Sequence, residues 1–178
     1  MARRISFPGI EEYAKQINKL SGATLPIINK AVYNGAGVVA DTCKENIRNA
    51  NIAVPDAGHG NEWPAIEAWK EFKKDGKIHN YTLTEKQKRG LINGLGLSTF
   101  VNEHGYINTK MGFDGYNEVK TKKYPKGQPN AMIMRTLESG TAALTKQPIV
   151  RKSVSQSREK CIDKMQKTLE NEIEKIIK

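Results

Sequence analysis

The chain has 178 residues, of which 38% are hydrophobic and 27% charged, a composition typical of one globular domain rather than a disordered chain. No apolar run approaches the roughly 18 residues that a membrane span needs, and no apolar stretch follows Arg3-Arg4 as a signal peptide requires. We therefore expect a protein made in the cytoplasm, without a membrane partner. The formal net charge of +10 favours an acidic partner: nucleic acid, an anionic surface or an acidic protein.

Two helices are predicted before residue 50. Tyr13, Ile17 and Leu20 have helical spacing, and Ser21-Gly22 is expected to end this short first helix. Thr24 is the expected N-cap of a second, much longer helix, with Pro26 in its first turn. The apolar stripe of the second helix advances in steps of three or four residues through Leu25, Ile28, Val32, Ala36, Val39, Cys43 and Ile47.

The middle of the chain changes from helical to strand periodicity. We expect a loop over 49–62, a short helix over 63–74 and another that starts at Thr84. From Leu95 to Phe113 apolar residues alternate with others in two runs separated by a turn, as half-buried strands require. Asp114-Gly115 is a hairpin signal. The segment Tyr116–Lys120 is then expected to form the third strand of an antiparallel meander.

The last third contains a loop, a short element and a long helix. Residues 120–130 hold two prolines and a glycine, which predict an irregular loop, and residues 131–138 form a helix or a strand. Pro148 precedes a C-terminal helix. The apolar stripe of that helix is Val150, Val154, Cys161, Met165, Leu169, Ile173 and Ile176. The fold class predicted for the single domain 1–178 is therefore α+β, with long amphipathic helices packed on a small antiparallel sheet, a three-stranded meander or slightly larger.

No pattern of residues predicts catalysis, a cofactor or a metal ion. His59, His79 and His104 fall in predicted loops and lack the spacing of a zinc or diiron site. Cys43 and Cys161 match no metal-ligand spacing, and we expect two reduced, buried thiols, with a disulfide as the alternative. The glycine run at 94–96 lacks the third glycine of a dinucleotide fingerprint, and it precedes a strand instead of following one. We therefore expect no enzymatic activity and no cofactor.

The densest charged feature is residues 120–126, which we call the lysine loop. No acidic residue lies between Glu118 and Glu138. A basic loop with an aromatic side chain can contact phosphates and stack a base, whereas the alternative is a merely solvated loop. The candidate contact residues for DNA or for an acidic protein partner are Lys120, Lys122, Lys123, Tyr124, Lys126 and Arg135.

Three pieces of sequence between residues 90 and 160 carry a family resemblance. They are Gly90-Leu91 through Gly96-Leu97-Ser98, then Gly112-Phe113-Asp114-Gly115-Tyr116-Asn117 with the lysine loop, and Arg135 to Thr141 with Glu138-Ser139-Gly140-Thr141. In this order and spacing they resemble the head–tail joining or tail-completion (neck) family of phage minor structural proteins, whose signature is Glu-x-Gly-Thr. Ile149 departs from the family's usual phenylalanine, and residues 1–84 resemble the family only in being helical. The matching residues are Gly112, Asp114, Gly115, Glu138, Gly140, Thr141 and Pro148.

The resemblance implies a non-enzymatic α+β subunit of a virion or phage-like particle. It would form a homo-oligomeric ring, most simply a hexamer, at the head-proximal end of the tail. Its partners would be the tail tube or tail terminator protein and the head connector or stopper protein, with DNA passing through the channel. We expect the signature to be structural, with Gly140 at positive φ and Glu138 anchoring the turn through backbone N–H groups. The alternatives are a tail terminator, a tail assembly factor or a basic nucleic-acid-binding protein.

Overall fold

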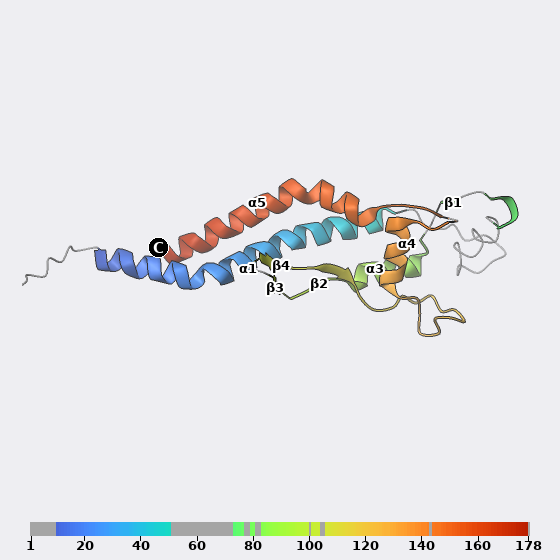
Figure 1. Ribbon diagram of the computed structural model, residues 1–178, viewed down its shortest axis with the longest axis horizontal. Helices are drawn as coiled ribbons and strands as arrows, with labels where there is room; N and C mark the ends of the chain where they lie inside the picture. The colour runs from blue at the N-terminus through green and yellow to red at the C-terminus, as the bar shows by residue number, and fades with distance from the viewer. Residues whose placement is uncertain are drawn as a thin grey trace, which may run out of the picture.

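Two long antiparallel helices, lying side by side, form the spine of the molecule (Figure 1). The computed structural model describes residues 10–50, 73–76, 79–80, 83–99, 101–103, 106–142 and 144–177. The main elements in chain order are α1 (Ile10–Arg48), β1 (His79–Asn80), α3 (Glu85–Gly94), β2 (Leu95–Leu97), β3 (Val101–Glu103), β4 (Tyr106–Asn108), β5 (Met111–Phe113), α4 (Asn130–Ser139), β6 (Leu144–Thr145) and α5 (Ile149–Ile177). This arrangement is α+β, as the sequence predicted. The expected loop over 49–62 and the expected helix over 63–74 lie mostly outside the described residues.

Helix α1 is one continuous helix of 39 residues, so the predicted division at Ser21-Gly22 is wrong. Gly22 does not adopt the positive φ that usually ends a helix at glycine. Pro26 lies inside the helix, where it removes one backbone hydrogen bond. The hydroxyl of Thr24 donates to the carbonyl of Leu20, 2.9 Å away in the preceding turn, and does not act as an N-cap.

Small side chains line the contact between α1 and α5. Ser153 and Ser157 of α5 are fully buried, at 0% exposure, whereas the predicted core residue Val154 is 50% exposed. Each serine hydroxyl donates to a carbonyl one turn earlier in its own helix, at 2.7 Å, so its burial leaves no unpaired donor. On α1, Gly35 faces the side chain of Met165, where an added Cβ would lie 2.5 Å from Cγ. The two backbones therefore approach closely.

Amides and thiols complete this contact. The Nδ2 of Asn46 donates to Ser153 Oγ at 2.8 Å, and that of Asn34 donates to Thr168 Oγ1 at 3.2 Å. Cys43 and Cys161 lie on α1 and α5 as free thiols, and burial raises the pKa of both. Both thiols are free, as predicted; Cys43 is fully buried, whereas Cys161 is only partly buried, so the predicted burial holds for Cys43 alone.

Strands β2 to β5 form a two-stranded antiparallel ribbon instead of a three-stranded meander, and β1 pairs separately with β6 in parallel. Strand β2 pairs with β5, and β3 pairs with β4 further along the same hairpin. Tyr116–Lys120 is not a strand, and its only bridge joins Tyr116 to Pro129. The side chain of Asn117 accepts the N–H of Val119 at 2.9 Å, which turns the chain away from the ribbon. The predicted third strand is therefore wrong.

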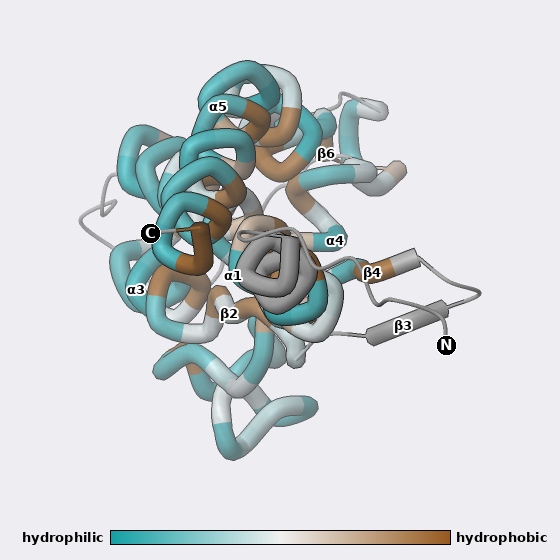
Figure 2. Tube along the Cα trace, turned by 90° about the vertical axis from the view of Figure 1, so that its left-hand side faces the viewer, coloured by the Kyte–Doolittle hydropathy of each residue, from teal (hydrophilic) through white to brown (hydrophobic). Residues whose placement is uncertain are grey.

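The core lies where α3 and the ribbon pack against the C-terminal half of α1, and α4 packs against α3, β5 and α5. Seen along the long axis, α5 and β2 lie on different sides of α1 (Figure 2). Its largest fully buried side chains are Ile47, Leu83, Leu91 and Leu137. The predicted start of α3 at Thr84 is confirmed, with a capping box that pairs Thr84 and Gln87. The buried ammonium of Lys88 donates to the carbonyl of Arg48 at 2.6 Å and so caps the C-terminus of α1. The short element over 131–138 is a helix, α4.

The close contact at Gly35 can be tested with a matched glycine on the same helix. Gly35→Leu should lower the free energy of unfolding by about 1–3 kcal/mol, because the new side chain must displace Met165 and Cys161. Gly37→Leu should keep or raise stability, since no atom lies within 4 Å of its Cβ position and leucine favours helices. Chemical denaturation of both variants measures the difference. Equal effects would contradict the packing of α5 on Gly35.

Candidate partner-contact site

The lysine loop is anchored at both ends by buried residues. Val119 and Gln128 are each 2% exposed. At the base, the backbone N–H of Asn117 donates to the carbonyl of Gln128 at 2.9 Å. Gly127 has φ +113°, and a Cβ there would collide with the carbonyl oxygen of Asn117. The two chain segments that enter and leave the loop are thus held together by backbone contacts.

Within the loop, a tight turn holds the backbone. The N–H of Thr121 donates to the carbonyl of Tyr124 at 3.1 Å, and the N–H of Tyr124 donates back to Thr121 at 3.0 Å. The hydroxyl of Thr121 also accepts the N–H of Tyr124. The loop protrudes from the end of the molecule that holds α3 and α4 (Figure 1).

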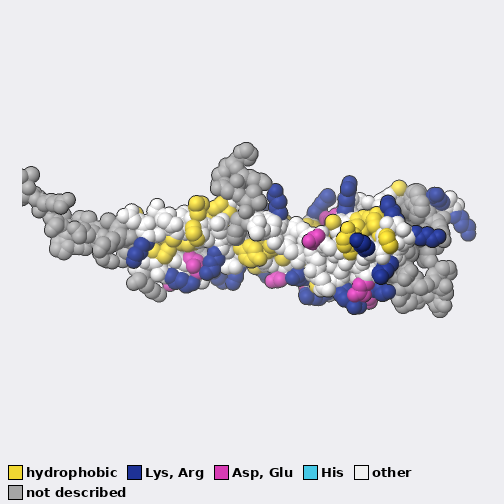
Figure 3. Space-filling model, turned by 90° about the horizontal axis from the view of Figure 1, so that it is seen from below, with side chains coloured by type: hydrophobic (Ala, Val, Ile, Leu, Met, Phe, Trp, Pro, Cys, Tyr) yellow, Lys and Arg dark blue, Asp and Glu magenta, His cyan; other side chains and the backbone are white. Residues whose placement is uncertain are grey.

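The loop presents positive charge to solvent. Lys120, Lys122, Lys123 and Lys126 are all exposed. Tyr124 is half-buried, and the ammonium of Lys123 lies 5.4 Å from the centroid of its ring. Seen from below, Lys and Arg side chains border much of this end of the molecule (Figure 3).

Two further charged features, an ion pair of Glu118 and the side chain of Arg135, belong to this end of the molecule. Glu118, just before the loop, lies 3.7 Å from the guanidinium of Arg89, so the nearest acid already faces a positive charge. Arg135 is exposed on α4, outside the loop.

A buried polar cluster beneath the loop was not predicted. The amide of Gln87 donates to Gln128 Oε1 at 2.8 Å, and that of Asn130 donates to the carbonyl of Asp114 at 2.7 Å. Asn117 is the fourth member of this group and is also buried. Of these four residues, only Gln87 stands in a local motif, three residues after Thr84 as a capping box requires. The other contacts join residues that no local motif relates.

Asp114 and Gly115, in the second piece of the family resemblance, join three elements. The N–H of Asp114 donates to the carbonyl of Gly94 at 2.8 Å, at the end of α3, and a Cβ at Gly94 would collide with the carbonyl of Asp114. The N–H of Asn130, the first residue of α4, donates to the carbonyl of Gly115 at 3.0 Å. Gly115 has φ +73°. Gly112, by contrast, is exposed in β5 and has no atom within 4 Å of its Cβ position.

Glu138 and Gly140 connect α4 to α5. Gly140 has φ +70°, as predicted, and its N–H donates to the carbonyl of Thr136 at 2.8 Å. The carboxylate of Glu138 accepts the N–H of Val150 in the first turn of α5, where the helix dipole favours a negative charge. The prediction that Glu138 anchors its own turn is therefore wrong: the backbone N–H that its carboxylate accepts belongs to the next helix.

The remaining signature residues lie in the link between α4 and α5. Thr141 is exposed, and its backbone N–H and carbonyl both form hydrogen bonds with Leu144. Pro148 is half-buried and immediately precedes α5.

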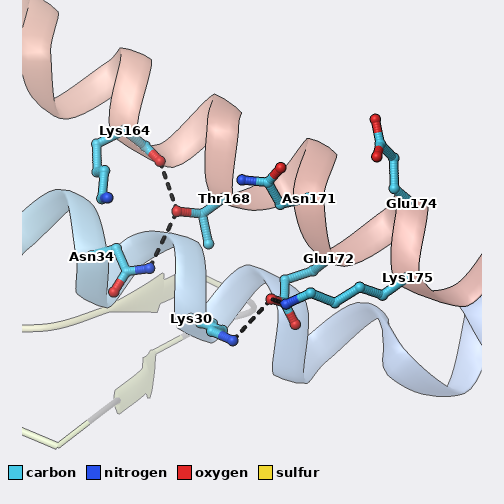
Figure 4. Close-up of a pocket in the computed structure, with 8 residues that line it drawn as sticks. All are labelled: Lys30, Asn34, Lys164, Thr168, Asn171, Glu172, Glu174 and Lys175. Atoms are coloured by element: carbon cyan, nitrogen blue, oxygen red, sulfur yellow. Dashed lines mark hydrogen bonds and ion pairs between the residues drawn. The ribbon is translucent and has the colours of Figure 1, made fainter.

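A groove of about 500 Å³ between α1 and α5 is lined by Glu172, which lies beside Lys30 and Lys175 (Figure 4). Glu172 Oε1 accepts hydrogen bonds from Lys175 at 2.7 Å and from Lys30 of α1 at 2.9 Å. These bonds, that of Lys175 first, hold the pKa of Glu172 below its ordinary value. The bond from Lys30 joins α1 to α5, and we call this arrangement of Glu172, Lys175 and Lys30 the clasp.

Among the residues described, no group of three or more His, Cys, Asp or Glu side chains is placed to hold a metal ion. His59 and His104 lie outside the described residues. No helix in the described ranges is long and apolar enough to cross a membrane. Comparison with known proteins found no matching family model, curated protein or solved structure.

The role of Gly140 can be tested against Gly112, another residue of the family signature. Gly140→Val should lower the free energy of unfolding by about 1–3 kcal/mol, because a β-branched residue resists positive φ and its Cβ would lie 2.8 Å from the carbonyl of Leu144. Gly112→Val should have little effect, since it adds a strand-favouring residue in open space. Thermal unfolding of both variants measures this. A stable Gly140→Val protein would mean that the turn tolerates another geometry.

The clasp at Glu172 should make stability depend on pH. Because the folded pKa lies below the ordinary value of 4.5, its contribution is present above that pH and is lost as the pH falls through the folded pKa. Wild type should therefore unfold at higher denaturant than Glu172→Gln at neutral pH, and the gap should close in acid. The control Asp163→Asn, an exposed acid on the same helix, should follow wild type throughout. A gap that persists in acid would show that the carboxylate charge does not act.

Proposed function

We propose that this protein is a non-enzymatic structural subunit of a phage or phage-like tail. In this proposal it forms a ring, most simply a hexamer, at the head-proximal end. The ring completes the tail and joins the tail tube or terminator protein to the head connector or stopper protein. The resemblance of residues 90–160 to neck proteins is the origin of the proposal.

The observation that carries the proposal is that residues on which the resemblance depends hold elements of the fold together. Glu138 and Gly140 tie α4 to α5, and Asp114 and Gly115 tie β5 to α3 and α4. These residues act through backbone geometry and helix capping, which suits a subunit whose task is to hold a fixed shape. The resemblance therefore concerns the framework of the fold, and function follows from it by analogy.

Exposed apolar side chains on the long helices support assembly. Ile17 and Leu25 are at least half exposed on α1, and Val154, Ile162 and Ile177 are so on α5. Helix α1 also extends beyond the C-terminal end of α5 (Figure 1). Neighbouring copies that repeat one head-to-tail contact around the tail axis would cover such surface and close a ring. The lysine loop and residues 138–147 are the proposed contacts with partners.

Deletion of the gene from the phage or prophage genome tests the proposal. We expect heads and tails that each form but do not join, or tails with an unfinished end, and electron microscopy of the lysate distinguishes these from complete particles. Complementation with Gly112→Val should restore joining, whereas Gly140→Val should not. Normal infectious or bactericidal particles from the deletion strain would refute the neck assignment.

Mass spectrometry of purified wild-type particles separates the closest alternative. A neck subunit stays in the particle at ring stoichiometry. A tail assembly factor is absent from the finished particle even though its deletion blocks assembly, and a tail terminator remains on tails that have never met a head.

A further inference from the structure

We propose that the lysine loop binds the phosphate backbone of double-stranded DNA without reading its sequence. The inference rests on the proposed function for the source of the DNA, which would be the genome that passes through the tail. The purified protein alone is expected to bind DNA in this way, so the binding can be measured without assembled particles.

The charge of the loop is concentrated and unopposed within it. Four exposed lysines fall within the seven residues 120–126, and no acid lies between Glu118 and Glu138. Glu118, the preceding acid in the sequence, lies 3.7 Å from Arg89, and among the described residues it forms no ion pair with any of the four lysines. A duplex carries about one negative charge per 1.7 Å of its axis, and therefore supplies several phosphates within reach of one such loop.

The loop backbone is organised before any partner arrives. Its ends are closed by the bond between Asn117 and Gln128, and its tip is closed by the paired bonds between Thr121 and Tyr124. The lysines thus project from a turn that needs little ordering on binding, which lowers the entropic cost of the contact. The position of the loop at a protruding end leaves it accessible to a rod-shaped ligand (Figure 1).

The composition of the loop favours a DNA backbone over an acidic protein. Protein–protein interfaces are depleted in lysine and enriched in aromatic and apolar anchors. Most hydrogen bonds to DNA go to phosphates and sugars, and lysine is a principal donor. Among residues 120–126 the exposed side chains are the four lysines and Pro125, so the loop exposes only one small apolar side chain and no aromatic one.

The geometry of Tyr124 argues against base recognition. Its side chain is half-buried, and the ammonium of Lys123 lies 5.4 Å from its ring centroid. A ring held in this way is not a free platform on which a base could stack. The loop therefore suits phosphate contacts along an intact duplex, and binding should be independent of sequence.

Two variants with equal loss of charge test the inference. The loop variant carries Lys120→Gln, Lys122→Gln, Lys123→Gln and Lys126→Gln. The control variant carries Lys152→Gln, Lys160→Gln, Lys164→Gln and Lys167→Gln, four exposed lysines of α5. Thermal unfolding should be unchanged in both, since all eight side chains are exposed. Fluorescence anisotropy with labelled duplexes of two unrelated sequences then gives affinity as a function of salt.

Wild type should bind both duplexes equally, with an affinity that falls linearly on a log–log plot against salt. The loop variant should lose about tenfold or more in affinity at low salt, and its slope should decrease by about 0.9 for each phosphate contact removed. The control variant should keep most of the wild-type slope.

Three results would overturn the inference. Equal losses in the two variants would assign binding to net charge alone. A preference for one sequence would indicate base readout, and loop-dependent binding to polyglutamate as tight as to the duplex would assign the loop to an acidic protein. Each of these leaves the deletion phenotype unaffected, so failure of the DNA contact is distinguishable from failure of the neck assignment.

Discussion

The close pairing of α1 with α5 is the contact on which the rest of the structure depends. It joins segments more than a hundred residues apart, and it is the most extensive contact between any two described elements. Gly35 on one helix and the buried serines on the other keep the side-chain layer thin. The C-terminal half of α1 then has one side for α5 and another for the ribbon and α3, with α4 packed on α3, β5 and α5. A larger residue in the interface would separate the helices and disturb both sides.

Polar contacts hold the smaller elements against this spine. Lys88 caps the C-terminus of α1, and Glu138 caps the N-terminus of α5, at the same end of the helix pair. Both charges are placed where the helix dipole and the unpaired terminal groups stabilise them. The strength of a buried hydrogen bond lies mainly in the cost of leaving its partner unpaired. These caps therefore fix the positions of α3 and α4 as well as the ends of the long helices.

The charges around Glu172 and the charges of the lysine loop have different surroundings. Along the long helices, Glu172 lies between two lysines and joins α5 to α1. In the lysine loop, the lysines have no acid within their own turn, and the backbone that carries them is closed by hydrogen bonds. Free charge on an ordered loop is suited to contact with an external anion, whereas the compensated charge of the helices serves stability. This contrast is the physical basis for proposing partner contact at the loop.

Local chemistry determined several features that could be read from the sequence alone. The capping box at Thr84, the positive φ of Gly140, the exposed lysines of the loop and the start of α5 after Pro148 each depend on residues within a few positions of one another. Tertiary contacts decided the rest. Apolar periodicity favoured Val154 for the core, but the close approach of α1 admits only small side chains, so Ser153 and Ser157 are buried there instead. The continuity of α1 through Ser21-Gly22 and the irregular path after Tyr116 likewise differ from what the local signals favoured. In the segment after Tyr116, the N–H of Asn117 donates to the carbonyl of Gln128, more than ten residues away, and no motif of neighbouring residues encodes a contact at that separation.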